Sequence, residues 1–66
     1  MTRTAREDIY RNLRCAASSA THRGPLVAAW YLGMAEGRTV DNYIEDEALG
    51  DWIQGCWDAL ERMAAA

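Results

Sequence analysis

The C-terminal third of the chain contains the segment LGDWIQGCWDALERM, residues 49–63, and the spacing of its apolar positions decides the fold class. At about 100° of rotation per residue, these positions fall within an arc of about 140° on one side of a helix. They are Leu49, Trp52, Ile53, Cys56, Trp57, Leu60 and Met63. Because such a stripe is typical of an amphipathic helix packed on a core, we predict a helix over about 51–64, with Asp51 as its N-cap.

The residues just upstream do not continue this stripe. On one unbroken helix, Val40, Tyr43 and Ile44 would lie about 140–170° from its centre, on the side of the charged residues. We therefore predict a break near residues 48–50 and a separate helix over about 40–48, capped by Thr39.

The N-terminal part of the chain predicts a helix over about 4–20. Thr4 and Glu7 have the spacing of a capping box, in which each side chain accepts a hydrogen bond from the other's backbone N–H. The apolar residues of this segment share one face at helical spacing. They are Ala5, Ile9, Leu13, Ala16 and Ala20.

Gly24-Pro25 predicts the start of another helix, over about 25–36, because proline favours the first helical position and Gly37 suits the residue after the end. Its apolar residues surround the helix on almost every side, which indicates burial by the other helices or by a second copy of the chain. They are Leu26, Val27, Trp30, Tyr31, Leu32 and Met34. We therefore expect a single all-α domain over 1–66, a compact bundle of about four short helices, with a homodimer as its expected assembly.

The net charge of −3 conceals an asymmetry along the chain. The first 23 residues hold five arginines against two acids, whereas the segment 39–61 holds acids and no base. Those acids are the candidate partner-binding residues: Asp41, Glu45, Asp46, Glu47, Asp51, Asp58 and Glu61. Clustered carboxylates favour a basic partner surface, such as one that normally holds nucleic acid. The alternatives are a solvated face, or neutralisation by the arginines of the first helix.

Three tryptophans are many for a chain of 66 residues, whose core can hardly bury them all. Aromatic residues often anchor protein interfaces, so Trp30, Tyr31 and Trp52 are candidate anchors, with burial in the core as the alternative.

Other function classes have little support in the sequence. There is no nucleophile elbow, Gly-rich phosphate loop or Cys-x-x-Cys pair, and His22 with the distant Cys15 and Cys56 does not make a zinc site. We therefore expect no enzyme activity, metal or cofactor. The two thiols are either free or joined in a disulfide. Without a signal peptide or a long apolar run, we expect a cytoplasmic protein that does not enter membranes.

In its small size, acidic positions, lack of an enzyme motif and Arg/Ala-rich composition, the chain resembles the small proteins with which phages and mobile elements disable host systems, anti-CRISPR proteins in particular. The resemblance lies in overall character and not in an aligned segment. It implies a non-enzymatic inhibitor in a bacterial host cell that blocks a DNA-binding or assembly surface of a CRISPR effector complex. Two alternatives are a helical adaptor or dimer that binds a host transcription regulator through its apolar helix, and a small DNA-binding regulator. Direct nucleic-acid binding is disfavoured by the acidic balance.

Overall fold

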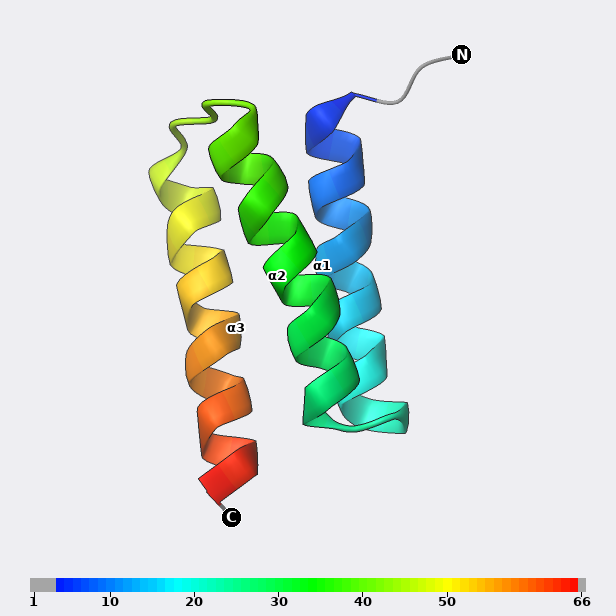
Figure 1. Ribbon diagram of the computed structural model, residues 1–66. Helices are drawn as coiled ribbons and strands as arrows, with labels where there is room; N and C mark the ends of the chain where they lie inside the picture. The colour runs from blue at the N-terminus through cyan, green and yellow to red at the C-terminus, as the bar shows by residue number, and fades with distance from the viewer. Residues whose placement is uncertain (1–3, 66) are drawn as a thin grey trace.

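The computed structural model describes residues 4–65, which form three helices: α1 (Ala5–His22), α2 (Pro25–Asp41) and α3 (Glu47–Ala65). The predicted all-α fold is confirmed, but the predicted number of helices is wrong. The segment 40–48 is not a separate helix: α2 extends to Asp41, the residues 42–46 form a loop, and α3 begins at Glu47. Figure 1 shows α1 and α2 as an antiparallel pair, with α3 on the other side of α2.

Helix α1 begins at the predicted capping box. The Glu7 N–H donates to Thr4 Oγ1 at 3.1 Å, and the Thr4 N–H donates to Glu7 Oε2 at 3.3 Å. At the other end, the N–H groups of Arg23 and Gly24 both donate to the carbonyl of Ser19. Gly24 has a φ of 102°, in the region that favours glycine, so it lets the chain turn sharply before Pro25 starts α2.

Helix α2 does not end at Gly37 as predicted. The hydrogen bonds that end the helix lie about six residues beyond Gly37. The Tyr43 N–H donates to the carbonyl of Val40 and the Ile44 N–H donates to the carbonyl of Thr39, both at 3.1 Å. This is a Schellman motif in which Tyr43, with a φ of 53°, occupies the left-handed position usually held by glycine. Gly37 therefore lies inside the helix. Thr39, predicted as an N-cap, instead donates its hydroxyl to the carbonyl of Ala35.

The predicted helix break between Val40 and Leu49 is confirmed, but it lies upstream of the predicted position. Asp46 starts α3, because its Oδ1 accepts from the Leu49 N–H at 3.0 Å and its carbonyl accepts from the Gly50 N–H. One carboxylate thus caps the helix four residues before Gly50, and Asp51 lies within the helix and not at its N-cap.

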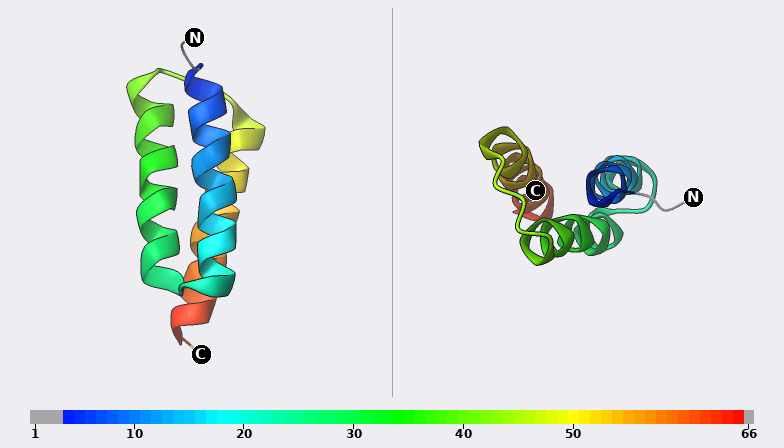
Figure 2. Two further views of the ribbon diagram at one scale, coloured as in Figure 1. Left: turned by 90° about the vertical axis from the view of Figure 1, so that its right-hand side faces the viewer. Right: turned by 90° about the horizontal axis from the view of Figure 1, so that it is seen from above.

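The core contains residues from all three helices, and α2 packs more closely on α1 than on α3. It consists of Ile9, Leu13, Ala16, Ala28, Leu32, Ala35, Leu49, Ile53 and Leu60. Small residues such as Ala16 and Ala28 allow α1 and α2 to lie close together. Helix α3 packs mainly on α2, where the Trp57 indole N–H donates to Glu36 Oε2 at 3.2 Å. Seen from above, α1 and α3 lie against two different sides of α2, so that the three helices mark the corners of a triangle (Figure 2).

Candidate functional site

Four of the seven predicted acidic site residues form a stripe along α3. Glu47, Asp51, Asp58 and Glu61 are all exposed and fall within about 80° of one another around the helix. The centre of the stripe lies about 145° around the helix from the centre of the buried residues, and the ends of the stripe are about 21 Å apart along the axis. Within residues 4–65, no basic side chain forms an ion pair with these carboxylates. We call these four residues the acidic stripe.

The other three predicted acids lie elsewhere. Asp46 is bound by Arg6, whose Nη1 donates to Asp46 Oδ2 at 2.9 Å. The Leu49 N–H and, second, the Arg6 guanidinium hold the pKa of Asp46 below its ordinary value, and Asp46 in turn raises the pKa of Arg6. Asp41 lies at the end of α2 beside a shallow hollow, and Glu45 lies exposed in the loop. The structure therefore does not bring the seven acids together in one patch.

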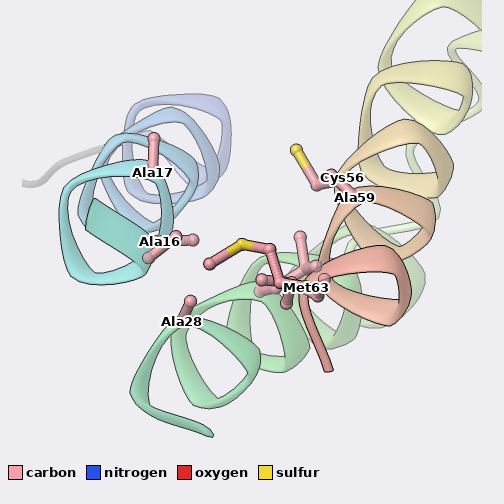
Figure 3. A pocket seen from close by; sticks show the side chains of 9 residues that line it. Ala16, Ala17, Ala28, Cys56, Ala59 and Met63 are labelled. Carbon is pink, nitrogen blue, oxygen red and sulfur yellow. The ribbon is translucent and has the colours of Figure 1, made fainter. Parts of the chain in front are cut away.

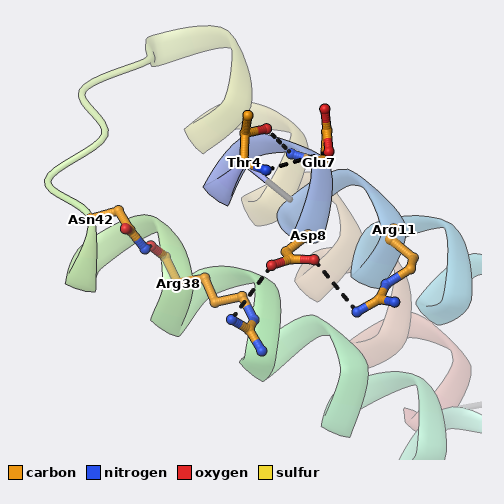
Figure 4. A network of polar contacts seen from close by, with 6 residues as sticks. All are labelled: Thr4, Glu7, Asp8, Arg11, Arg38 and Asn42. Atoms are coloured by element: carbon orange, nitrogen blue, oxygen red, sulfur yellow. Dashed lines mark hydrogen bonds and ion pairs between the residues drawn. The ribbon is translucent and has the colours of Figure 1, made fainter. Parts of the chain in front are cut away.

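Some arginines of the N-terminal third form ion pairs with carboxylates of the same chain. Asp8 lies between two guanidinium groups, 3.5 Å from Arg11 and 3.9 Å from Arg38, so that it joins α1 to α2 (Figure 4). With Arg6 held by Asp46, these ion pairs reduce the basic surface available to nucleic acid.

The predicted aromatic anchors occupy two places. Trp30 is 64% exposed on α2, and its ring centroid lies 5.2 Å from that of the partly buried Tyr31. Trp52 is 47% exposed on α3 and stacks on Tyr10 of α1, with ring centroids 5.8 Å apart. Trp52 therefore holds α3 against α1 near one end of the molecule, whereas Trp30 is directed to the surface.

The outward face of α2 is apolar, and the other two helices do not cover it, so burial of this helix within one chain is wrong and burial by a second copy stays a prediction. Leu26 is 87% exposed, and Trp30 and Val40 are also mostly exposed. Gly33 and Gly37 lie on the same face by helical spacing, and nothing occupies the space that a Cβ would fill at either position. No charged residue occurs on α2 between Pro25 and Ala35, so this face differs from the charged outward faces of α1 and α3.

An apolar groove that the sequence reasoning missed opens between the C-terminal halves of α1 and α3, with a volume of about 190 Å³. Figure 3 shows Met63 extending from α3 across the groove toward Ala16 of α1. The groove exists because α1 carries no large apolar side chain beyond Leu13 on this side. Its wall on α1 consists of Ala16, Ala17 and Ala20, whose short side chains cannot fill the space between the two helices. These alanines were the sequence signal that could have predicted it.

Metal ligation and disulfide formation are not supported by the described geometry. Among residues 4–65, no three His, Cys, Asp or Glu side chains are placed to hold a metal ion. Cys15 and Cys56 are both free thiols, and burial raises the pKa of Cys56, which lines the groove. No helix in this part of the chain has the length and apolar character needed to cross a membrane.

Comparison of the chain with known protein families, with curated proteins and with solved structures finds no match. The surfaces themselves are therefore the basis for a functional proposal.

Proposed function

We propose that this protein is a non-enzymatic inhibitor that binds a basic surface of a host complex through the acidic stripe of α3. The observation that carries the proposal is the position of Glu47, Asp51, Asp58 and Glu61: exposed, directed away from the core, and joined to no basic side chain within the described residues. Like charges spaced three or four residues apart on a helix repel one another, so a helix selected only for stability would intersperse bases among them.

The dimensions of the stripe limit what it can imitate. Four carboxylates over about 21 Å give one charge per about 7 Å, whereas one DNA strand carries a phosphate per about 3.4 Å of axis. The stripe thus has about half the charge density of a single strand. It suits a basic site of about 20 Å, and not the full footprint of a duplex.

In line with the resemblance in overall character to anti-CRISPR proteins, the partner class that we propose is a CRISPR effector complex in the bacterial cytoplasm. Such a complex holds a nucleic acid in a positively charged channel, which is the kind of surface that an acidic stripe can occupy. Binding there would be stoichiometric and would need no chemistry from the inhibitor.

The test measures binding of a labelled target duplex by a panel of purified effector complexes, with increasing amounts of this protein. The stripe variant Asp51→Lys/Asp58→Lys should lose inhibition, while the control Asp41→Lys/Glu45→Lys, which changes the net charge equally, should retain it. Inhibition should also weaken steeply between about 50 and 200 mM salt. If the stripe variant inhibits as strongly as the control variant, the stripe is only a solvated surface.

A second candidate function is that of an adaptor that pairs with itself, or with a transcription regulator, through the outward face of α2. The exposure of Leu26, Trp30 and Val40 favours it, since a stable interface buries about 800 Å² on each partner and apolar side chains concentrate at its centre. Sedimentation would show a concentration-dependent dimer that Trp30→Glu abolishes and that salt barely affects. A mass near 7.4 kDa at every concentration would reject self-association.

A further inference from the structure

The apolar groove between α1 and α3 has a definite cause in the packing. The two helices are joined at one end, by the Arg6–Asp46 ion pair and the stacked rings of Tyr10 and Trp52. Toward the other end the lining residues of α1 are alanines, too short to span the space to α3, and the groove lies over Ala28 and Leu32 of α2. Long side chains therefore fill the space between α1 and α3 at one end, and short side chains leave it open at the other.

The size and lining of the groove exclude most small molecules. Its volume of about 190 Å³ is larger than a benzene-sized cavity of about 150 Å³ but below the 300–1,000 Å³ or so of pockets for cofactors and drug-sized ligands. The lining is wholly apolar apart from the Cys56 thiol, so nothing there would orient a polar ligand. The groove suits one or two apolar side chains carried by a larger molecule.

The shape around the groove fits a helix as the carrier of those side chains. Helices α1 and α3 both stand on α2, and the position between them, opposite α2, is the place of the fourth helix in a four-helix bundle (Figure 2). The walls are built from Ala16, Ala17 and Ala20 on one side and Ala59 on the other, which lets a backbone approach closely. The lining on α3, from Cys56 to Met63, rises about 10 Å, or two helical turns.

The charges beside the groove indicate the chemistry of the partner. An arginine lies at the outer edge of each wall: Arg14 lies about 60° around α1 from Ala17, and Arg62 lies about 60° around α3 from Ala59, between the groove and the acidic stripe. Both are exposed, and neither forms an ion pair within residues 4–65. Acidic side chains on either side of an apolar stripe would meet these two guanidinium groups.

We propose that the groove between α1 and α3 binds an amphipathic helix of a partner protein, a helix that carries acidic residues beside its apolar stripe. This site is separate from the acidic stripe, which lies on the outward side of α3. A second copy of the chain is a poor occupant. The apolar side chains that are mostly exposed on a helix lie on the outside of α2, and insertion of that face into the groove of another copy would be a head-to-tail contact that does not close into a dimer.

The test uses a fluorescein-labelled synthetic helical peptide of about 18 residues, with leucines at positions i, i+3, i+4 and i+7 and glutamates beside them. Fluorescence anisotropy should show saturable binding to the full-length protein. A peptide with arginine in place of glutamate should bind at least about fivefold more weakly, and Arg14→Gln/Arg62→Gln should abolish that preference.

The groove itself is tested by Ala17→Glu, which places a carboxylate in its wall and should weaken binding at least about tenfold. Ala17 is exposed, so the fold should tolerate the change, and circular dichroism verifies this. The matched control is Gly33→Glu, which adds the same charge on the outward face of α2 and should leave binding unchanged. Ala59→Leu, which fills the groove without charge, should weaken binding as well.

Three results would overturn the proposal: equal binding by the Ala17→Glu and Gly33→Glu variants, tighter binding of the arginine peptide, or a dimer in sedimentation that Ala17→Glu dissociates. The last would identify a second copy as the occupant. The variant Asp51→Lys/Asp58→Lys should still bind the glutamate peptide, so failure of the groove proposal is distinguishable from failure of the acidic stripe.

Discussion

Two substitutions in α2 test where this helix ends. Gly37 lies inside the helix, and nothing occupies the space that a Cβ would fill there. Tyr43 takes the left-handed position after the end, with a φ of 53°, and its side chain is 91% exposed. Both residues are therefore poorly suited to their backbone positions. Replacing Gly37 by alanine and Tyr43 by glycine should each stabilise the protein.

The magnitudes follow from the backbone conformations. Glycine inside a helix is less favourable than alanine by about 0.5–1 kcal/mol, so Gly37→Ala should gain about that amount. A residue with a Cβ in the left-handed region costs about 1–2 kcal/mol. Because glycine loses about 0.5–1 kcal/mol more entropy on folding, Tyr43→Gly should gain a net 0.5–1 kcal/mol or so. For a domain of this size, each gain corresponds to about 2–8 °C in Tm.

The assay is thermal and urea unfolding of the wild type and the two single variants, followed by circular dichroism at 222 nm. If α2 ended at Gly37, as the sequence alone suggests, Gly37 would need its own conformational freedom, and Gly37→Ala would lower Tm. A lower Tm for Gly37→Ala would therefore refute the extended helix and the reasoning drawn from it.

The remaining predictions concern the core and the loop. Leu13→Ala should cost about 3–5 kcal/mol of unfolding free energy, but Leu32→Ala only about 2–3 kcal/mol. Leu32 is buried but lines the groove, so its truncation would deepen a space that water can enter, whereas truncation of Leu13 would leave a closed cavity. Urea unfolding compares the two variants, and an equal cost would contradict this. Asp46, whose pKa is lowered by the Leu49 N–H and by Arg6, stabilises the fold fully above about pH 4, and this is lost as pH falls through its lower folded-state pKa. Asp46→Asn should therefore have a lower Tm than wild type at pH 7, with the difference closing in acid. Asn12 is buried, and its Nδ2 has no hydrogen-bond partner among residues 4–65, so Asn12→Ala should keep or raise stability, and a loss above about 1 kcal/mol would argue against an unsatisfied amide.

The sequence predicted part of the candidate site because helical periodicity places residues on faces. Once α3 is one helix, the positions of Asp51 and Asp58 opposite the buried side of the helix, with Glu61 beside them, follow from rotation alone. Periodicity does not specify which arginine meets which carboxylate. The pairing of Arg6 with Asp46 spans 40 residues and depends on how α3 lies against α1.

The error in the number of helices has a local cause. Glycine at 37 and 50 suggested two helix ends, yet glycine only permits an end and does not impose one. The capping bonds of Asp46 and the backbone bonds at Tyr43 decide the ends instead. A tyrosine in the left-handed region is rare, so no sequence pattern would have placed it there.

What the sequence by itself determined are the features set by neighbouring residues: the all-helical fold, the capping box at Thr4, the turn at Gly24-Pro25 and the amphipathic face of α3. These depend on interactions within about one helical turn, which the order of residues specifies directly. Only the tertiary structure decided the exposed face of α2, the removal of Asp46 from the acidic patch and the groove beside Ala17. Each of these depends on the angle and distance between whole helices, which result from the packing of all three at once and are not encoded in any one segment.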